Sequence, residues 1–229
     1  MIEILNPAPK TTSNFASYQP GQQYTLYSGG ENVGSVSIQK SGPLQCDSNA
    51  AVVSFNGSLH FSKDVIALAT NATAIRTHRN VKRPVDDAER SMMIQVAISQ
   101  LQKQGVFATV SSKFNTDNLV ATSVDSSGAT TLIGLVSVEL NKVRHETFLI
   151  VRVAGSQPVV EMSSYHQTMD LDDGKDSQNL RFADQLDLDG DGIDEVVVEL
   201  TGYENEEFWV YKRGGATWTR VAVGGQGGC

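Results

Sequence analysis

The chain has 229 residues, of which 40% are hydrophobic and 19% charged, and this composition is typical of a globular protein large enough to bury a core. Its formal net charge of −8 argues against nucleic acid as a partner, because phosphate binding needs clustered Lys and Arg. No apolar run approaches the roughly 18 residues that a membrane-spanning helix requires, so we expect no membrane span.

The first 80 residues are predicted to form an antiparallel β region. After an irregular lead-in that contains Pro7, Pro9 and Pro20, two β-rich runs flank the glycine turn at residues 28–30, which is typical of a hairpin. Further strands are predicted at residues 50–55, 64–69 and 74–75.

Residues 76–83 form the one strongly basic stretch of the sequence. We interpret it as a solvated connector, with a docking site for an anion or an acidic partner as the alternative.

A long helix is predicted over residues 85–104. Asp86 and Glu89 suit its first turn, since carboxylates cap and complement a helix N-terminus, and Gly105 provides the stop. The expected buried stripe consists of Val85, Ala88, Met92, Val96 and Ser99, widened by Met93, Ala97 and Leu101.

Short strands separated by turns follow the helix. They are predicted at residues 107–111, 118–124, 131–140, 147–153 and 159–163, and four consecutive strands follow at 180–188, 195–203, 207–213 and 217–223. The expected fold class is therefore mostly β (α+β), with antiparallel sheets, one long helix and a C-terminal meander that resembles one propeller blade. The predicted division is residues 1–80 and 81–229, with one continuous domain as the alternative.

The segment at residues 187–195 reads DLDGDGIDE and has the residue types of a metal site. Asp187, Asp189 and Asp191 alternate, and a glycine after the third permits a sharp turn. Hard cations such as Ca²⁺ take about six to eight oxygen ligands, and alternate acids on a turning chain can supply several of them. A bound divalent ion also explains why so many like charges are crowded together.

The register of this loop excludes an EF-hand. If Asp187 is position 1, position 12 is Val198 rather than the bidentate Glu that an EF-hand needs, and the flanking residues favour strands over helices. The expected ligands are therefore the side chains of Asp187, Asp189, Asp191 and Glu195, with the carbonyl of Ile193 as a fifth. Asp194 either coordinates the ion or faces water. A second acidic run, at residues 170–176, is interpreted as a solvated loop, with a further ligand for the ion or a second ion site as the alternative.

The loop resembles the FG-GAP/VCBS type of calcium loop, which runs D-x-D/N-x-D-G-x-x-D/E into a hydrophobic strand. The match covers Asp187, Asp189, Asp191, Gly192 and Glu195, followed by the valines at 196–198, with Glu at the ninth position where Asp is commoner. The resemblance spans about 15 residues and implies Ca²⁺ in a strand–loop–strand hairpin. It does not imply a full propeller, and the sequence has no clear repeat.

The two cysteines, Cys46 and Cys229, are expected to form a disulfide, with two unrelated thiols as the alternative. Such a bridge would close nearly the whole chain into a loop and would require an oxidising compartment. A weak calcium loop also suits extracellular calcium levels. We therefore expect a secreted, periplasmic or cell-surface location, although the residues after Met1 do not form a signal peptide.

Strand alternation places Trp209 and Tyr211 on one face of a C-terminal strand. This face is predicted either to pack in the core or to form an aromatic surface for a glycan or peptide.

Motifs for catalysis are lacking, and we predict no catalytic residue. A combination of His145 or His166 with a serine and a carboxylate is attributed to chance. The expected function is a non-catalytic, calcium-binding structural or binding module. The sequence does not identify its ligand, and a glycan and a protein are the candidates. The alternative is a secreted hydrolase of glycans or peptides in which calcium is purely structural.

Overall fold

The computed structural model describes residues 2–4, 19–44, 47–58, 67–79, 81–155, 157–169, 179–202 and 206–227. Within these ranges the chain forms three β-sheets and one helix, so the predicted fold class, mostly β with antiparallel sheets and one long helix, is confirmed. The predicted pair of cysteines and the second acidic run lie outside the described residues.

The N-terminal sheet has the strand order β1-β5-β2-β3-β4. Its strands are β1 (Ile2–Ile4), β2 (Gln23–Ser28), β3 (Glu31–Leu44), β4 (Asp47–Gly57) and β5 (Ala67–Thr70). The pair β1 and β5 is parallel, and the other neighbours are antiparallel.

The second sheet, which we call the helix-backed sheet, has the order β11-β10-β9-β8-β6, with β7 paired to β9. Its strands are β6 (Arg83–Pro84), β7 (Phe114–Asn115), β8 (Val120–Thr122), β9 (Thr131–Leu140), β10 (Val143–Ala154) and β11 (Gln157–Thr168). The helix α1 (Asp87–Lys103) packs on one face of this sheet.

The C-terminal sheet is an antiparallel meander in the order β12-β13-β14-β15. Its strands are β12 (Asn179–Leu186), β13 (Glu195–Thr201), β14 (Glu206–Gly214) and β15 (Thr217–Gly227). The four strands predicted for this part of the sequence are therefore present and consecutive, with bounds that differ by a few residues.

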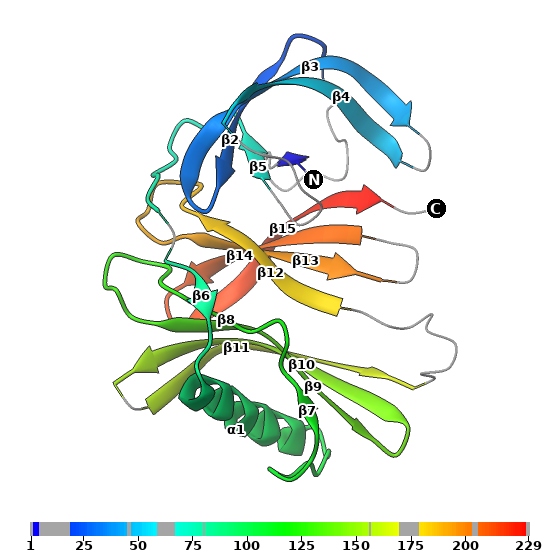
Figure 1. The fold of residues 1–229 in the computed structure, drawn as a ribbon, viewed down its shortest axis with the longest axis vertical. Helices are drawn as coiled ribbons and strands as arrows, with labels where there is room; N and C mark the ends of the chain where they lie inside the picture. The colour runs from blue at the N-terminus through cyan, green and yellow to red at the C-terminus, as the bar shows by residue number, and fades with distance from the viewer. Residues whose placement is uncertain are drawn as a thin grey trace.

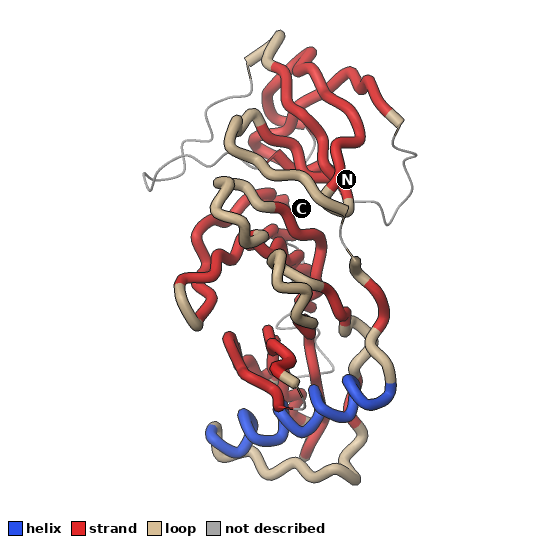
Figure 2. The backbone as a smooth tube through the Cα atoms, turned by 90° about the vertical axis from the view of Figure 1, so that its left-hand side faces the viewer, coloured by secondary structure: helices blue, strands red, loops and turns tan. Residues whose placement is uncertain are grey.

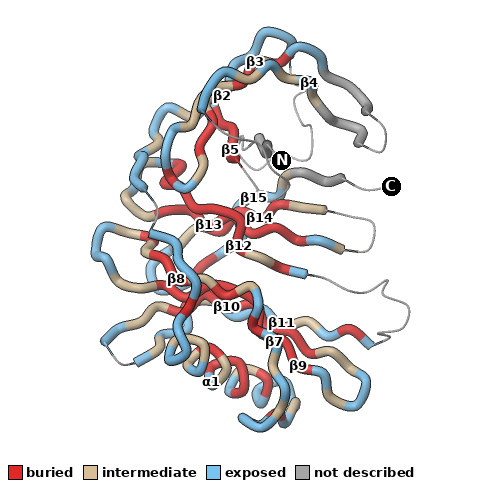
Figure 3. Tube along the Cα trace, in the orientation of Figure 1, coloured by how far each residue is buried: buried red, intermediate tan, exposed pale blue. Residues whose placement is uncertain are grey.

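The sheets are stacked as layers, with the C-terminal sheet between the N-terminal sheet and the helix-backed sheet, and with α1 outermost (Figures 1 and 2). The continuous apolar run at the start of β13 follows from this central place, because a strand that is covered on both faces needs apolar side chains on both. Val196 and Val198 face the helix-backed sheet, whereas Val197 faces the N-terminal sheet. All three are completely buried, as the burial of the central strands in Figure 3 illustrates.

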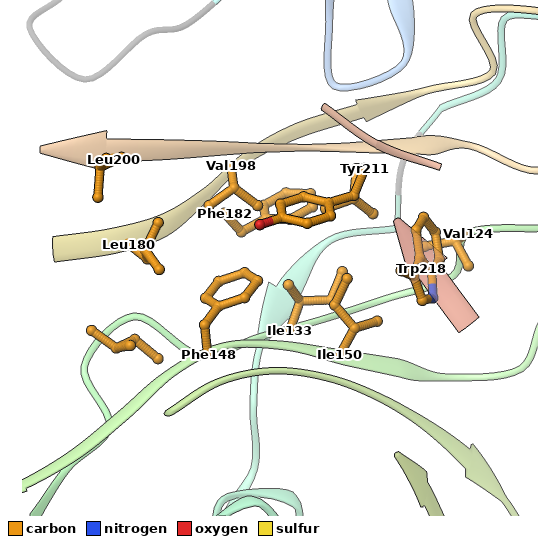
Figure 4. Packing of buried hydrophobic residues seen from close by; sticks show 12 residues of the cluster. Val124, Ile133, Phe148, Ile150, Leu180, Phe182, Val198, Leu200, Tyr211 and Trp218 are labelled. Carbon is orange, nitrogen blue, oxygen red and sulfur yellow. The ribbon is translucent and has the colours of Figure 1, made fainter. Parts of the chain in front are cut away.

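The largest core cluster lies between the C-terminal and helix-backed sheets (Figure 4). Phe148, Ile150 and Ile133 reach up from β9 and β10 toward Phe182 and Val198 of the sheet above. On the other face of the C-terminal sheet, a separate cluster joins Val197, Phe208 and Val210 to Tyr27 and Leu68 of the N-terminal sheet.

A capping box begins α1, as the acidic first turn predicts. Asp86 accepts a hydrogen bond from the Glu89 N–H at 2.8 Å, and Glu89 accepts one from the Asp86 N–H at 2.9 Å. The buried face differs from the predicted stripe, because Ala88 and Ser99 are exposed whereas Met93, Ala97 and Leu101 are buried. The buried face of the helix is therefore centred on Met93, Ala97 and Leu101, which the prediction placed at the side of the stripe.

The strand predicted at residues 107–111 is wrong. This segment is a loop that leads from α1 toward β7, and Phe107 is 80% exposed. Residues 74–75 are also loop rather than strand.

Candidate metal centre

The acidic loop joins β12 to β13 and is shaped by its own carboxylates. Asp187 accepts hydrogen bonds from the backbone N–H groups of Gly190 at 2.7 Å and Gly192 at 2.8 Å. Asp191 likewise accepts one from the Ile193 N–H at 2.9 Å. Both glycines have positive φ, 80° and 88°, so they occupy the left-handed conformation that glycine adopts without strain. Alternate aspartates and glycines thus produce a tight turn that gathers negative charge.

Three carboxylates converge on one point in this loop. Asp187, Asp189 and Glu195 each offer an oxygen, and these oxygens lie within 4.8 Å of one another, so that the group could hold a metal ion. Asp187 and Glu195 are buried, whereas Asp189 is exposed. Carboxylate oxygens are the donors that hard cations prefer, and the donor set therefore fits such an ion.

Two of the five expected ligands lie outside this group as the described residues form it. Asp191 is exposed, and it adjoins the group through a shared contact with Lys212. The backbone of Ile193 is held within the loop, since its N–H donates to Asp191, and Ile193 also forms an isolated β-bridge with Asp125.

The ammonium group of Lys212, from β14, lies among the carboxylates. It donates hydrogen bonds to Asp189, to Asp191 Oδ2 at 2.7 Å and to Glu195 Oε1 at 3.2 Å. The sheet register explains this position, because Tyr211 pairs with Val196 and the next residues, Lys212 and Glu195, are therefore neighbours across β14 and β13. No feature of the sequence around the acidic loop indicates this lysine, which lies 17 residues beyond Glu195.

The environment shifts the pKa values of these groups in different directions. Although partial burial opposes it, hydrogen bonding to three carboxylates raises the pKa of Lys212. The hydrogen bond from Lys212 lowers the pKa of Asp191. Burial raises the pKa of Glu195 even though the Leu188 N–H and Lys212 both donate to its carboxylate. The lysine therefore stays cationic and favours the ionised form of the carboxylates around it.

Asp194 neither faces water nor belongs to the group of three converging carboxylates. It is 1% exposed, and its Oδ2 accepts a hydrogen bond from Gln185 Nε2 at 2.6 Å and pairs with His78 Nε2 at 3.1 Å. Its Oδ1 has no hydrogen-bond partner among the described residues. Burial raises the pKa of Asp194 to about 6, against the opposing effects of His78 and Gln185.

The described residues of the basic connector that precedes α1 are exposed, as the interpretation of a solvated connector expects, but the first of them also contact the acidic loop. The N–H of Arg76 donates to the Asp187 carbonyl at 3.2 Å, and His78 pairs with Asp194. Gly190 lies so close to Ala74 that a Cβ on Gly190 would be 2.5 Å from the Ala74 carbonyl oxygen. Opposite charges on the two segments are the signal that could have indicated this contact.

Trp209 and Tyr211 do not together form the exposed aromatic surface that was one of the two alternatives for this face. Tyr211 is 6% exposed and belongs to the core between the C-terminal and helix-backed sheets, so for this residue core packing is the correct alternative. Trp209 is half-buried against the same core. Its indole N–H donates to Glu207 at 2.9 Å, and the guanidinium of Arg220 lies 4.6 Å from its ring centre.

A small cavity near Trp209 brings together Glu146, Ser164 and His166. Register explains this, since Glu146 pairs with His166 across β10 and β11, and Ser164 lies two residues away on the same face. The cavity has a volume of about 140 Å³. Glu146 is buried, and burial raises its pKa. His145 is on the other face of β10, where its Nδ1 is 2.8 Å from the Tyr165 hydroxyl.

Comparison of the chain with family models, with curated proteins and with solved structures gave no match. Among the described residues we find no helix with the length and apolar character needed to cross a lipid bilayer.

Proposed function

We propose that this chain is a non-catalytic calcium-binding module in which one Ca²⁺ orders the hairpin between β12 and β13. The observation that carries the proposal is the convergence of Asp187, Asp189 and Glu195, whose oxygens lie within 4.8 Å of one another. Ca²⁺ accepts such all-oxygen sets in flexible geometry. The resemblance of residues 187–195 to the FG-GAP/VCBS loop supports the same ion.

The position of these residues indicates what the ion would do. Asp187 follows β12 directly and Glu195 begins β13, so a shared cation would hold the two strand ends together. The cation would also relieve the repulsion between carboxylates that are partly shielded from water. Because Asp187 contacts Arg76 and Gly190 contacts Ala74, the ordering would extend to the chain between the N-terminal sheet and α1.

The biological setting that we propose is a secreted, periplasmic or cell-surface one, where calcium is abundant and a disulfide between Cys46 and Cys229 is stable. We propose a glycan or a protein as the ligand of such a module. The half-buried Trp209, with Arg220 over its ring, is the part of the predicted aromatic surface that still supports this role.

The alternative, a secreted hydrolase, has one observation in its favour, which is the cavity that contains Glu146, Ser164 and His166. Ligand pockets usually measure about 300–1,000 Å³. A cavity of about 140 Å³ is smaller than this range, and we therefore favour the non-catalytic module.

The test of the calcium proposal is a thermal melt in 2 mM CaCl₂ against excess EGTA, combined with calorimetric titration of Ca²⁺. For a dissociation constant of about 10⁻⁴–10⁻³ M, 2 mM calcium should stabilise the folded chain by about 0.6–1.8 kcal/mol. This corresponds to a rise in Tm of roughly 1–7 °C for a chain of this size.

The double substitution Asp189→Asn and Asp191→Asn should abolish most of this calcium-dependent rise, because it removes two charges from exposed side chains and keeps their shape. Asp117→Asn, at an exposed aspartate before β8, is the matched control and should keep the full rise. Identical melts of the unsubstituted chain in calcium and in EGTA, with no heat of binding, would refute the proposal.

A further inference from the structure

Lys212 already supplies a positive charge at the point where the proposed ion would bind. Its Nζ donates to Asp189 and to Glu195 Oε1, and these residues are two of the three in the converging group. It also donates to Asp191 Oδ2 at 2.7 Å. A lysine on a different strand therefore satisfies the same carboxylates that a metal ion would use.

Lysine and metal cannot use these oxygens at the same time. Calcium binds oxygens at about 2.3–2.6 Å, and an ammonium group that remained bonded to the same oxygens would lie within a few ångströms of a doubly charged ion. Two like charges at such a distance repel strongly where the surroundings are partly buried, and Glu195 is only 4% exposed. One of the two cations must leave before the other can bind.

Lys212 is able to leave. Its side chain is 32% exposed, so a path to water exists, and its four-carbon stem can turn the ammonium group outward. Asp189 and Asp191, which hold it from the open side, are 52% and 40% exposed. The lysine is thus attached near the surface of the site rather than enclosed in it.

We propose that Lys212 is a tethered counter-ion that competes with the divalent cation for the loop, and this inference rests on the calcium-binding function proposed above. In the absence of metal the lysine neutralises the carboxylates and keeps the hairpin folded. In the presence of metal it swings out. It therefore sets the calcium concentration at which the loop fills.

The size of the effect follows from the fraction of time for which the site is open. If the lysine occupies the site for 90–99% of the time, the apparent dissociation constant is about 10- to 100-fold weaker than the intrinsic one. Removal of the lysine charge should recover this factor.

The experiment compares Lys212→Gln with the unsubstituted chain by calcium titration calorimetry and by melts in EGTA. We expect Lys212→Gln to bind calcium at least about tenfold more tightly and to have a lower Tm in EGTA, because its carboxylates then lack a counter-ion. Lys113→Gln changes the net charge equally at an exposed position outside the loop, and it should leave both measurements unchanged. Lys212→Arg keeps the charge and should bind calcium as weakly as the unsubstituted chain.

A second measurement follows the lysine itself and does not depend on how stable Lys212→Gln is. Reductive methylation of the unsubstituted chain, read by mass spectrometry, should modify Lys212 faster in saturating calcium than in EGTA, whereas methylation of Lys113 should not change.

The outcomes separate the two proposals. Equal calcium affinity of the unsubstituted chain and Lys212→Gln, or Lys212 methylation that calcium does not alter, would overturn the tethered counter-ion and leave the calcium module intact. Loss of calcium binding in Lys212→Gln alone would also overturn it, because the lysine would then support the metal. Absence of calcium binding in every variant would overturn both.

Discussion

The carboxylate of Asp194, within the acidic loop, is buried and incompletely paired. Gln185 and His78 contact its Oδ2, while the nearby Asp187 and Asp184 add negative charge that raises its pKa further. Gln185 is itself fixed, since its Nε2 also donates to the Ser123 carbonyl at 2.6 Å. Asp194 is therefore a position where ionisation is unfavourable for the folded chain.

The stability of the chain should depend on pH through Asp194. The folded chain raises the pKa of Asp194 from its ordinary 3.8 to about 6 and so holds this proton more tightly than the unfolded chain. The resulting stabilisation is complete below about pH 4 and is lost as the pH rises through 6, and a difference of this size is worth about 3 kcal/mol. In Asp194→Asn this loss should disappear, because an amide does not ionise and its oxygen still accepts from Gln185.

Urea unfolding in EGTA at several values between pH 4 and 8 measures this difference. The free energy of unfolding of the unsubstituted chain, taken relative to Asp194→Asn, should fall across the interval. Asp117→Asn serves as the control, and its pH profile should follow that of the unsubstituted chain. Parallel profiles for the unsubstituted chain and Asp194→Asn would show that Asp194 has an ordinary pKa.

Among the helices and strands, sequence patterns predict those elements whose position depends on the residues of the segment itself. The ten residues of β9 and the four strands of the C-terminal sheet follow from short runs rich in apolar and β-branched residues that are separated by turn residues. The helix follows from its cap and its length, but its buried face does not. Met92, Met93, Val96 and Ala97 form overlapping apolar stripes, and only contact with β9 and β10 selects the one that contains Met93 and Ala97.

Of the residues at the candidate site, some are likewise predictable from the sequence and others are not. Asp187, Asp189 and Glu195 are predictable because they lie within nine residues and their spacing is itself the signal. Lys212 and Ala74 are not predictable, because sheet register and chain packing bring them to the loop from distant parts of the sequence, and only the basic charge of the neighbouring connector hints at its contact with the loop. A pattern within a short segment carries no information on such neighbours.

The second prediction tests the contact between the connector and the acidic loop. Gly190 and Gly192 both have positive φ, so alanine at either position introduces backbone strain of about 1 kcal/mol. A Cβ at position 190 would also meet the Ala74 carbonyl oxygen at 2.5 Å, whereas the nearest atom to a Cβ at position 192 is Arg76 Nη1 at 3.7 Å. Gly190→Ala should therefore lower the free energy of unfolding by about 1–3 kcal/mol more than Gly192→Ala does.

Urea unfolding in EGTA provides the comparison, and the two alanine variants control for each other because they share the strained conformation. Equal losses of stability would mean that the connector does not pack against Gly190 in solution.

For the whole molecule, the question is whether the three layers unfold together. The predicted boundary at residue 80 separates the N-terminal sheet from the rest of the chain. One core cluster crosses that boundary, because Leu68 and Tyr27 pack with Val197, Phe208 and Val210 of the C-terminal sheet. Since Val197 and Phe208 are completely buried, separation of the two sheets would expose a large apolar surface. We therefore expect the N-terminal sheet to unfold together with the C-terminal sheet rather than independently.

The third prediction uses the tryptophans as reporters of this coupling. Both tryptophans of the chain, Trp209 and Trp218, belong to the C-terminal sheet, so their fluorescence follows that sheet alone. Leu68→Ala removes a completely buried side chain from the N-terminal sheet and should cost about 2–5 kcal/mol. If the shared cluster makes the layers one cooperative unit, the unfolding midpoint reported by the tryptophans falls with the midpoint reported by far-UV circular dichroism. Val81→Ala, at a residue that is 65% exposed, should leave both midpoints unchanged. A tryptophan midpoint that stays constant in Leu68→Ala while the circular dichroism transition splits would instead establish that the N-terminal sheet is a separate folding unit, in agreement with the boundary at residue 80.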